Sequence, residues 1–312
     1  MNKLLTASIM SLSLVACAPQ QESSVEGNQI GRVTEFADSS HQFTPEVMWQ
    51  MGRIGAFHLS ADAQKAVYGV TYYSVEQNKS RSVIYASTPN SDAVPALLTN
   101  NGSEYAPSFI PGTDKVAFLA SANDCSGTMQ LWMMNADGTG RQQISFEANG
   151  VDDYLFSPCG KKVVLVETVS HEASVQKNDD DLSKSTGIVA NDLMYKHWDH
   201  YTKSAPHPFV ADFDGNKVSG AKDLLEGEPY ESPMLPFGGA EQLAWSPDGK
   251  QIAYTCRKLS GIDYAISTDS DIFLYDIESG ETKNLCKPEG YVRPACDPTR
   301  SLKNQAVNQF LE

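Results

Sequence analysis

Side chains of the types that bind metal ions gather near the middle of the chain. Four of them lie close together in sequence: His197, Asp199, His200 and His207. Imidazole and carboxylate groups are common ligands of Zn²⁺ and related ions, so a metal-dependent enzyme is one interpretation. However, two histidines three positions apart fix no coordination geometry, and the neighbouring Trp198 and Tyr201 favour packing. We therefore predict no bound metal and no cofactor, and interpret this segment as an insertion anchored by aromatic side chains.

Other chemistry-bearing patterns are weak or absent. The acidic triplet Asp179 to Asp181 is interpreted as a solvated loop, because a Ca²⁺ site needs a fuller set of spaced oxygen ligands. The 312 residues contain no G-x-S-x-G nucleophile elbow, no H-E-x-x-H motif, no Walker loop and no dinucleotide-binding fingerprint. We therefore predict no catalytic residue within this sequence.

The cysteines indicate neither a metal site nor an obvious disulfide framework. No C-x-x-C pair occurs, and the number that follows the leader described below is odd. We interpret these residues as buried thiols. They are Cys125, Cys159, Cys256, Cys286 and Cys296.

A ten-residue pattern recurs four times and organises the chain. Each copy has an apolar residue, a short turn, a Lys and an alternating strand, and the clearest turn is Pro247-Asp248-Gly249. The copies start at Leu59, Phe109, Phe156 and Trp245, at intervals of 50, 47 and 89 residues. Repeats of about 40–50 residues with several strands are typical of β-propellers. The third interval is too long for one plain repeat, so we predict that it holds an insertion.

A second strand–turn–strand element follows each copy. Its turns are Asp137-Gly138, Asp214-Gly215 and Ser279-Gly280, with a weaker version after Val83. Such residues tolerate the positive φ angles of tight hairpin turns. Two hairpins per repeat predict an all-β fold, a β-propeller of four-stranded antiparallel blades. Before the first repeat, Thr44-Pro45-Glu46 predicts the start of a short helix, with Thr as N-cap and Pro in the first turn.

The first residues resemble a targeting segment. Residues 1–16 contain Lys3 and an apolar run that ends in Leu14-Val15-Ala16 before Cys17, which is the pattern of a bacterial lipoprotein signal peptide. We predict that Cys17 is lipidated and that residues 17–40 form a flexible tether. An ordinary secretion signal cut elsewhere is the alternative. The prediction places the protein in the bacterial envelope, on the periplasm-facing outer membrane, and the membrane is then a partner through the lipid anchor.

Composition excludes one class of partner. The net charge is −15, which argues against nucleic acid, because binding to phosphates depends on basic side chains. The hydrophobic fraction of 41% suits a globular β protein with one large core.

Several stretches resemble the propeller portion of the prolyl oligopeptidase family of serine peptidases, in particular the dipeptidyl peptidase V and acylaminoacyl-peptidase-like members. They are residues 44–55, 191–201, 227–258 and 267–285, and the resemblance covers roughly residues 40–291. It implies a propeller that screens peptides for an α/β-hydrolase domain carrying the Ser, Asp and His, with the N-terminal helix near that domain. No triad position matches this sequence. The resemblance makes three glutamates candidates for binding a peptide amine: Glu228, Glu231 and Glu241. The alternative interpretation is that they are ordinary charged loop residues.

The final stretch departs from the repeat. Another copy is expected near residue 295, but residues 292–312 show neither apolar alternation nor a turn–strand pattern. We interpret them as an aberrant tail produced by a disrupted reading frame near Tyr291, with a diverged but intact end as the alternative. The prediction for residues 41–291 is an open or marginally closed ring of about five blades, prone to aggregation.

The predicted function is therefore a propeller that gates peptide access without catalytic activity of its own. Its predicted partners are peptides and, where the propeller is completed to an enzyme, a separately encoded hydrolase domain. The alternative is a non-enzymatic envelope scaffold that binds protein partners. Fold alone does not choose between them.

Overall fold

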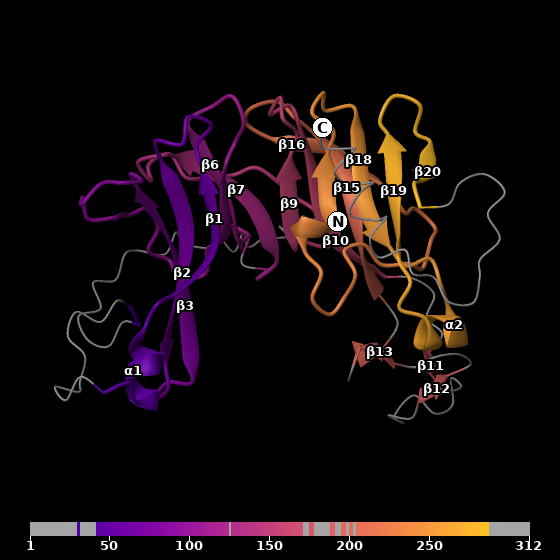
Figure 1. The fold of residues 1–312 in the computed structure, drawn as a ribbon, viewed down its shortest axis with the longest axis horizontal. Helices are drawn as coiled ribbons and strands as arrows, with labels where there is room; N and C mark the ends of the chain where they lie inside the picture. The colour runs from indigo at the N-terminus through magenta and orange to yellow at the C-terminus, as the bar shows by residue number, and fades with distance from the viewer. Residues whose placement is uncertain are drawn as a thin grey trace, which may run out of the picture.

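The computed structural model describes residues 30–31, 42–124, 126–170 and 204–286, together with the backbone of four short strands between residues 175 and 201. The described chain forms four four-stranded antiparallel sheets, which follow one another in a row (Figure 1). Each sheet keeps its strands in chain order, as consecutive hairpins require. The predicted β-propeller of four-stranded blades is confirmed, and these residues form four of the roughly five blades expected.

The blades are numbered 1 to 4 in chain order. Blade 1 contains β1 (Arg53–Leu59), β2 (Ala66–Ser74), β3 (Lys79–Ser87) and β4 (Ala96–Leu97). Blade 2 contains β5 (Tyr105–Phe109), β6 (Lys115–Ser121), β7 (Met129–Asn135) and β8 (Gln142–Gln143). Blade 3 contains β9 (Asp153–Phe156), β10 (Lys162–Ser170), β15 (Ser204–Phe213) and β16 (Val218–Asp223). Blade 4 contains β17 (Leu243–Trp245), β18 (Gln251–Cys256), β19 (Asp271–Asp276) and β20 (Thr282–Asn284).

The long third interval contains the predicted insertion. Two small strand pairs lie between β10 and β15 in sequence, and the helices are short. The pairs are β11 (Val175–Lys177) with β12 (Ile188–Ala190), and β13 (Tyr195–His197) with β14 (His200–Tyr201). The helices are α1 (Pro45–Gln50), α2 (Gly261–Ile266) and the 3₁₀ turn η2 (Ala240–Gln242).

Hydrophobic side chains between neighbouring blades hold the row together. Along β10, Val163 and Leu165 belong to the cluster shared with blade 2, whereas Val164 and Val166 belong to the cluster shared with blade 4. Successive side chains of a strand point to opposite faces, so a blade covered on both faces needs apolar residues at consecutive positions. Trp245 adds a hydrogen bond between blades, since its Nε1 donates to the carbonyl of Leu155 at 3.0 Å.

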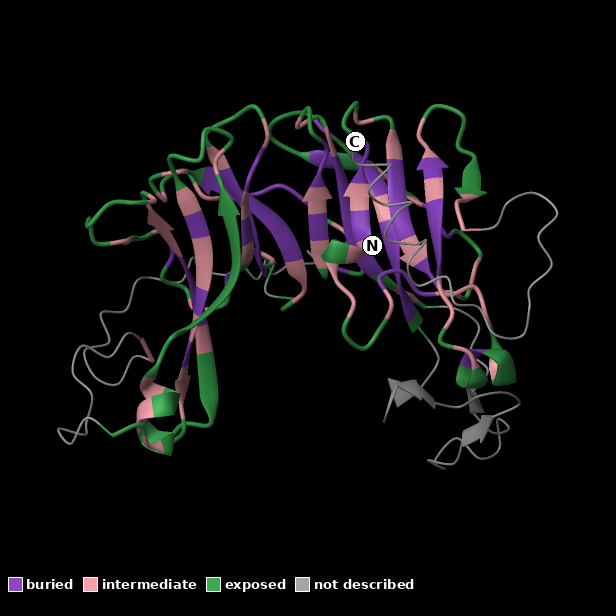
Figure 2. Cartoon of the chain, in the orientation of Figure 1, coloured by how far each residue is buried: buried purple, intermediate pink, exposed green. Residues whose placement is uncertain are grey.

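Blade 1 has one covered face and one open face. Leu59, which starts the first repeat, is 44% exposed, whereas Phe109, Phe156 and Trp245 at the equivalent positions are 7%, 8% and 6% exposed. These equivalent residues pack against the preceding blade, and no described blade precedes blade 1. All residues of β1 are exposed (Figure 2). The open face therefore carries apolar side chains without a sheet against them in the described chain.

Tight polar turns lie at one end of the blades. In the fourth copy the Ser246 hydroxyl donates to the Asp248 carboxylate at 2.6 Å, and this carboxylate also accepts from the Lys250 amide. Turns of neighbouring blades touch: at Gly160, where φ is +66°, a Cβ atom would lie 2.3 Å from the carbonyl oxygen of Pro111. Only a glycine fits this contact.

Both α-helices lie at the opposite end of the blades (Figure 1). The predicted cap of α1 is present, because the Val47 amide donates to the Thr44 hydroxyl at 3.3 Å. None of the α1 residues is buried. The helix contacts blade 1 through Trp49, whose ring lies edge-on to Tyr73, and Arg53 stacks on both rings. The helices of the described chain are too short to cross a membrane.

Candidate functional site

A pocket of about 220 Å³ opens along the first strands of blades 1, 2 and 3. These strands, β1, β5 and β9, bring side chains that are far apart in sequence to one place. We call it the first-strand pocket. Its lining residues are Ala56, Phe57, His58, Ala106, Pro107, Ser108, Phe109, Pro111, Asp153, Tyr154, Leu155 and Phe156. Most are apolar, which suits the binding of an apolar side chain.

Irregular strand pairing shapes the pocket. The register shifts between Ile54 and Phe57 in β1 and between Tyr105 and Ser108 in β5, and Ala106 has a φ of +47°. Such irregularities bend a strand and redirect its side chains. Here they let both strands contribute residues to the same pocket.

His58 is the basic group of the pocket. Its Nδ1 accepts a hydrogen bond from the Phe109 amide at 3.3 Å, and the two rings lie 6.1 Å apart. Burial lowers the pKa of His58, so the imidazole is neutral at pH 7. Because Nδ1 accepts, the ring proton resides on Nε2, and His58 is a hydrogen-bond donor at that atom.

Tyr154 ties blade 3 to blade 2 below the pocket. Its hydroxyl lies 2.5 Å from the carbonyl oxygen of Ala106 and 2.9 Å from that of Ala117, and it accepts from the Ser108 hydroxyl at 3.0 Å. Burial raises the pKa of Tyr154 far above its usual range. This tyrosine therefore holds blades together and does not exchange a proton at physiological pH.

Asp153 supplies the carboxylate of the pocket. Its two oxygens accept from the Tyr154 amide at 2.9 Å and from the Ala240 amide at 2.8 Å. Burial raises the pKa of Asp153, and these two hydrogen bonds oppose that rise. The residue thus fixes the segment leading to β17 against β9. Among the described residues that line the pocket, the Ser108 hydroxyl is bonded to Tyr154 and not to His58.

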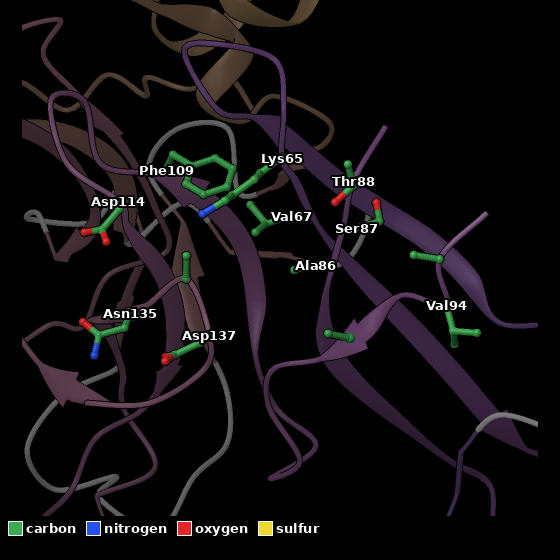
Figure 3. A pocket seen from close by; sticks show the side chains of 13 residues that line it. Lys65, Val67, Ala86, Ser87, Thr88, Val94, Phe109, Asp114, Asn135 and Asp137 are labelled. Atoms are coloured by element: carbon green, nitrogen blue, oxygen red, sulfur yellow. The ribbon is translucent and has the colours of Figure 1, made fainter. Parts of the chain in front are cut away.

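A second hollow lies between blades 1 and 2 and has a volume of about 640 Å³ (Figure 3). Val67, Ala86 and Phe109 supply its apolar lining, with Lys65 on one side and Asp114 on the other. These two residues and Asp137, the third charged residue of the lining, are all exposed. The hollow therefore lacks a buried polar group that would orient a ligand, and the first-strand pocket is the better candidate.

The residues considered as metal ligands separate into two groups. His207 lies on β15, is buried, and its Nδ1 is 2.8 Å from the Asp223 carboxylate. His197 and His200 lie on β13 and β14, and the surroundings of their side chains, like Asp199 and Asp179 to Asp181, fall outside the described residues. Within the described chain, no three His, Cys, Asp or Glu side chains are arranged to bind a metal ion.

The three candidate amine-binding glutamates make separate contacts. Glu228 pairs with Lys258 at 2.6 Å. Glu231 is buried and accepts from the Tyr264 hydroxyl at 2.5 Å, and Glu241 accepts from the Gly239 amide at 2.9 Å.

Other predicted positions have mixed outcomes. Cys256 is buried as predicted, Cys286 is half-buried, and Cys159 is exposed, so the prediction of burial is wrong for Cys159. Cys159 occupies the position of Asp248 in its copy of the hairpin turn, and a turn at the end of a blade is open to solvent. Residues 1–16, Cys17 and 292–312 lie outside the described residues.

Sequence reasoning missed the main pocket residues, His58, Asp153 and Tyr154. Each lies one to three positions before the start of a repeat copy, a position that the repeat itself did not mark. The available signal was their position just before a repeat copy, which places them on the first strands of the blades.

Comparison with known proteins agrees with the resemblance seen in the sequence. No family model matches the chain. It is 37% identical over 259 residues to dipeptidyl-peptidase 5 of Porphyromonas endodontalis, covering 83% of this chain and 37% of that protein. Dipeptidyl-peptidase 5 of Porphyromonas gingivalis is 36% identical over 248 residues, covering 80% and 36%. The chain thus spans little more than a third of the length of these relatives.

A solved structure supports the fold. The acylaminoacyl peptidase of Pyrococcus horikoshii matches with a TM-score of 0.51 and 16% identity, over 76% of this chain and 33% of that one. The resemblance to a peptidase-type propeller is therefore confirmed.

Proposed function

We propose that this chain is the peptide-admitting propeller of a serine peptidase similar to dipeptidyl-peptidase 5. The similarity to those proteins over 80% or more of this chain carries the proposal. The first-strand pocket supports it, because its apolar walls, the His58 donor and the Asp153 carboxylate suit an apolar peptide side chain and its neighbouring amide groups. In this proposal the pocket orients peptides and takes no part in bond cleavage.

The helix-bearing end is the proposed contact with a bond-cleaving domain. Large apolar side chains are exposed there on both helices: Met48 and Trp49 on α1, Met51 just after it, and Ile262 and Ile266 on α2. Exposed apolar patches commonly mark protein interfaces. The other end carries polar turns such as Ser246 to Lys250, which makes it a poorer contact surface.

The test measures peptide binding and cleavage separately. We expect residues 1–312 to bind peptides with an apolar residue near a free amino terminus, and not to hydrolyse dipeptidyl or acylaminoacyl chromogenic substrates. Phe57→Arg places a charge in the pocket and should weaken peptide binding about tenfold or more, a loss of about 1.4 kcal/mol. Leu97→Arg is the matched control, because Leu97 is an exposed apolar residue of blade 1 outside the pocket.

Three results would decide against the proposal. Hydrolysis of the chromogenic substrates by residues 1–312 alone would show that this chain is itself catalytic. If Phe57→Arg and Leu97→Arg weakened peptide binding equally, the first-strand pocket would not be the peptide-binding site. Capture of an envelope protein without any peptide binding would favour the scaffold function instead.

A further inference from the structure

Two buried titratable side chains face each other in blade 3. Glu167 on β10 is 3% exposed and His207 on β15 is 2% exposed. The two residues are directly opposite in the antiparallel register. Opposed residues of an antiparallel pair place their side chains on the same face of the sheet, with Cβ atoms about 5 Å apart. Glu167 and His207 therefore share one small buried space.

Each side chain keeps one polar atom without a hydrogen bond in the described chain. His207 bonds to Asp223 through Nδ1 at 2.8 Å, and its Nε2 has no such partner among the described residues. The carboxylate of Glu167 bonds to the Asn149 side chain, and its Oε1 is likewise unsatisfied there. Buried polar atoms are usually satisfied, so this pair of atoms marks an unusual place in the core.

The surroundings of Glu167 are acidic. The pKa of Glu167 is raised to about 7, mainly by burial and in addition by the acids Glu147, Asp223 and Asp152. Burial also raises the pKa of Glu147, with Lys217 acting in the opposite direction. An ionised Glu167 would thus be a buried anion among other acids.

The site lies at the junction of blades 2 and 3. Glu147, Asn149 and Asp152 belong to the segment that links β8 to β9, and the Asp152 amide donates to the Val166 carbonyl at 2.8 Å. We propose that the buried carboxyl group of Glu167 keeps its proton in the folded protein, and that loss of this proton as the pH rises loosens the junction of blades 2 and 3.

The sign of the pH dependence follows from the linkage between proton binding and folding. The folded state binds the proton of Glu167 more tightly than the unfolded state, in which the glutamate pKa is near its ordinary value of 4.5. Stability from this group is therefore fully present below about pH 4.5 and is lost as the pH rises through about 7. From pH 5 to pH 8, the folding equilibrium constant should fall on the order of 100-fold because of this group.

Urea unfolding at pH 5, 6, 7 and 8 tests the proposal. We expect Glu167→Gln to remove most of this fall, because glutamine does not ionise, whereas Glu278→Gln, at an exposed glutamate, should keep it. An E167Q profile parallel to the parent would overturn the proposal.

A measurement on the parent protein covers the case in which a variant does not fold. Amide hydrogen exchange, corrected for its intrinsic pH dependence, should show protection of Val163 to Val166 falling between pH 6 and pH 8 relative to Val67 to Val70 in blade 1. Equal changes in both segments would contradict a local switch. Both measurements report stability, so their outcome does not depend on whether the chain binds peptides.

Discussion

Two buried glutamates at successive blade junctions are stabilised in different ways. Glu104, between blades 1 and 2, is 1% exposed; its carboxylate pairs with Arg141 at 2.7 Å and accepts from the amides of Gly102 and Ser103. Arg141 in turn stacks on the rings of Phe118 and Trp132. Glu167, between blades 2 and 3, has acids around it and an unsatisfied oxygen in the described chain.

The comparison indicates that copies of one repeat can form junctions whose stability depends on pH to different extents. A buried carboxylate with a cation and amide donors stays ionised at little cost, whereas one without a cation favours its protonated form. The buried acid of the first junction is paired with a cation, whereas the second junction should respond to pH through Glu167. The apolar packing is of the same kind at both junctions, so the charged groups make the difference.

The largest expected effect comes from making the first junction resemble the second. Arg141→Met keeps an apolar stem on Phe118 and Trp132 but leaves Glu104 buried without its cation. We expect a loss of about 3 kcal/mol in the free energy of unfolding, larger at pH 8 than at pH 5. Urea unfolding at both pH values measures it, and Lys283→Met, at an exposed lysine, is the control. A loss below about 0.5 kcal/mol would remove the contrast between the junctions.

A smaller effect is expected at the second junction from a neutral group. Tyr154→Phe removes the hydroxyl shared by Ala106, Ala117 and Ser108, and two buried carbonyl groups lose this donor. We expect a loss of about 2 kcal/mol that does not vary between pH 5 and pH 8. Tyr105→Phe at an exposed tyrosine should leave the urea midpoint unchanged. A pH-dependent loss in Tyr154→Phe would mean that Glu167 is not the main source of the pH response.

The smallest effect on stability is expected where no junction exists. Ile54, on the open face of blade 1, is 70% exposed, so Ile54→Ser should change the free energy of unfolding by less than about 0.5 kcal/mol. It should nevertheless reduce self-association in sedimentation velocity, because it interrupts an apolar face. Ile262→Ser on α2 has similar exposure but lies at the helix-bearing end. Equal reductions by both variants would argue against a special role for the open face.

The sequence was sufficient to predict the blades because each hairpin is a local structure. The turn at Pro247 to Gly249 and the apolar residues Phe109, Phe156 and Trp245 mark where strands begin and end, and the structure places hairpins there. The helix at Pro45 was predictable for the same reason, since its cap lies one residue away. Cys159 was misjudged because its thiol occupies the place of a polar turn residue.

The sites were less predictable because they depend on register and on contacts between blades. Ala106 adopts a positive φ, which its residue type does not suggest. Glu167 and His207 come together across the insertion between β10 and β15, and only the pairing of those strands sets them opposite each other. His207 was noticed as a possible ligand, but nothing in the sequence assigned Glu167 to it.

The touching turns at Gly160 and Pro111 have a geometric consequence. Backbone contact between the turns of two neighbouring blades restricts the angle between those blades. In a β-propeller, the angle between neighbouring blades determines how many blades complete the ring. A methyl group at position 160 would push the two turns apart and change the angle between blades 2 and 3. The missing side chain of Gly160 thus lets blades 2 and 3 approach each other closely at this end.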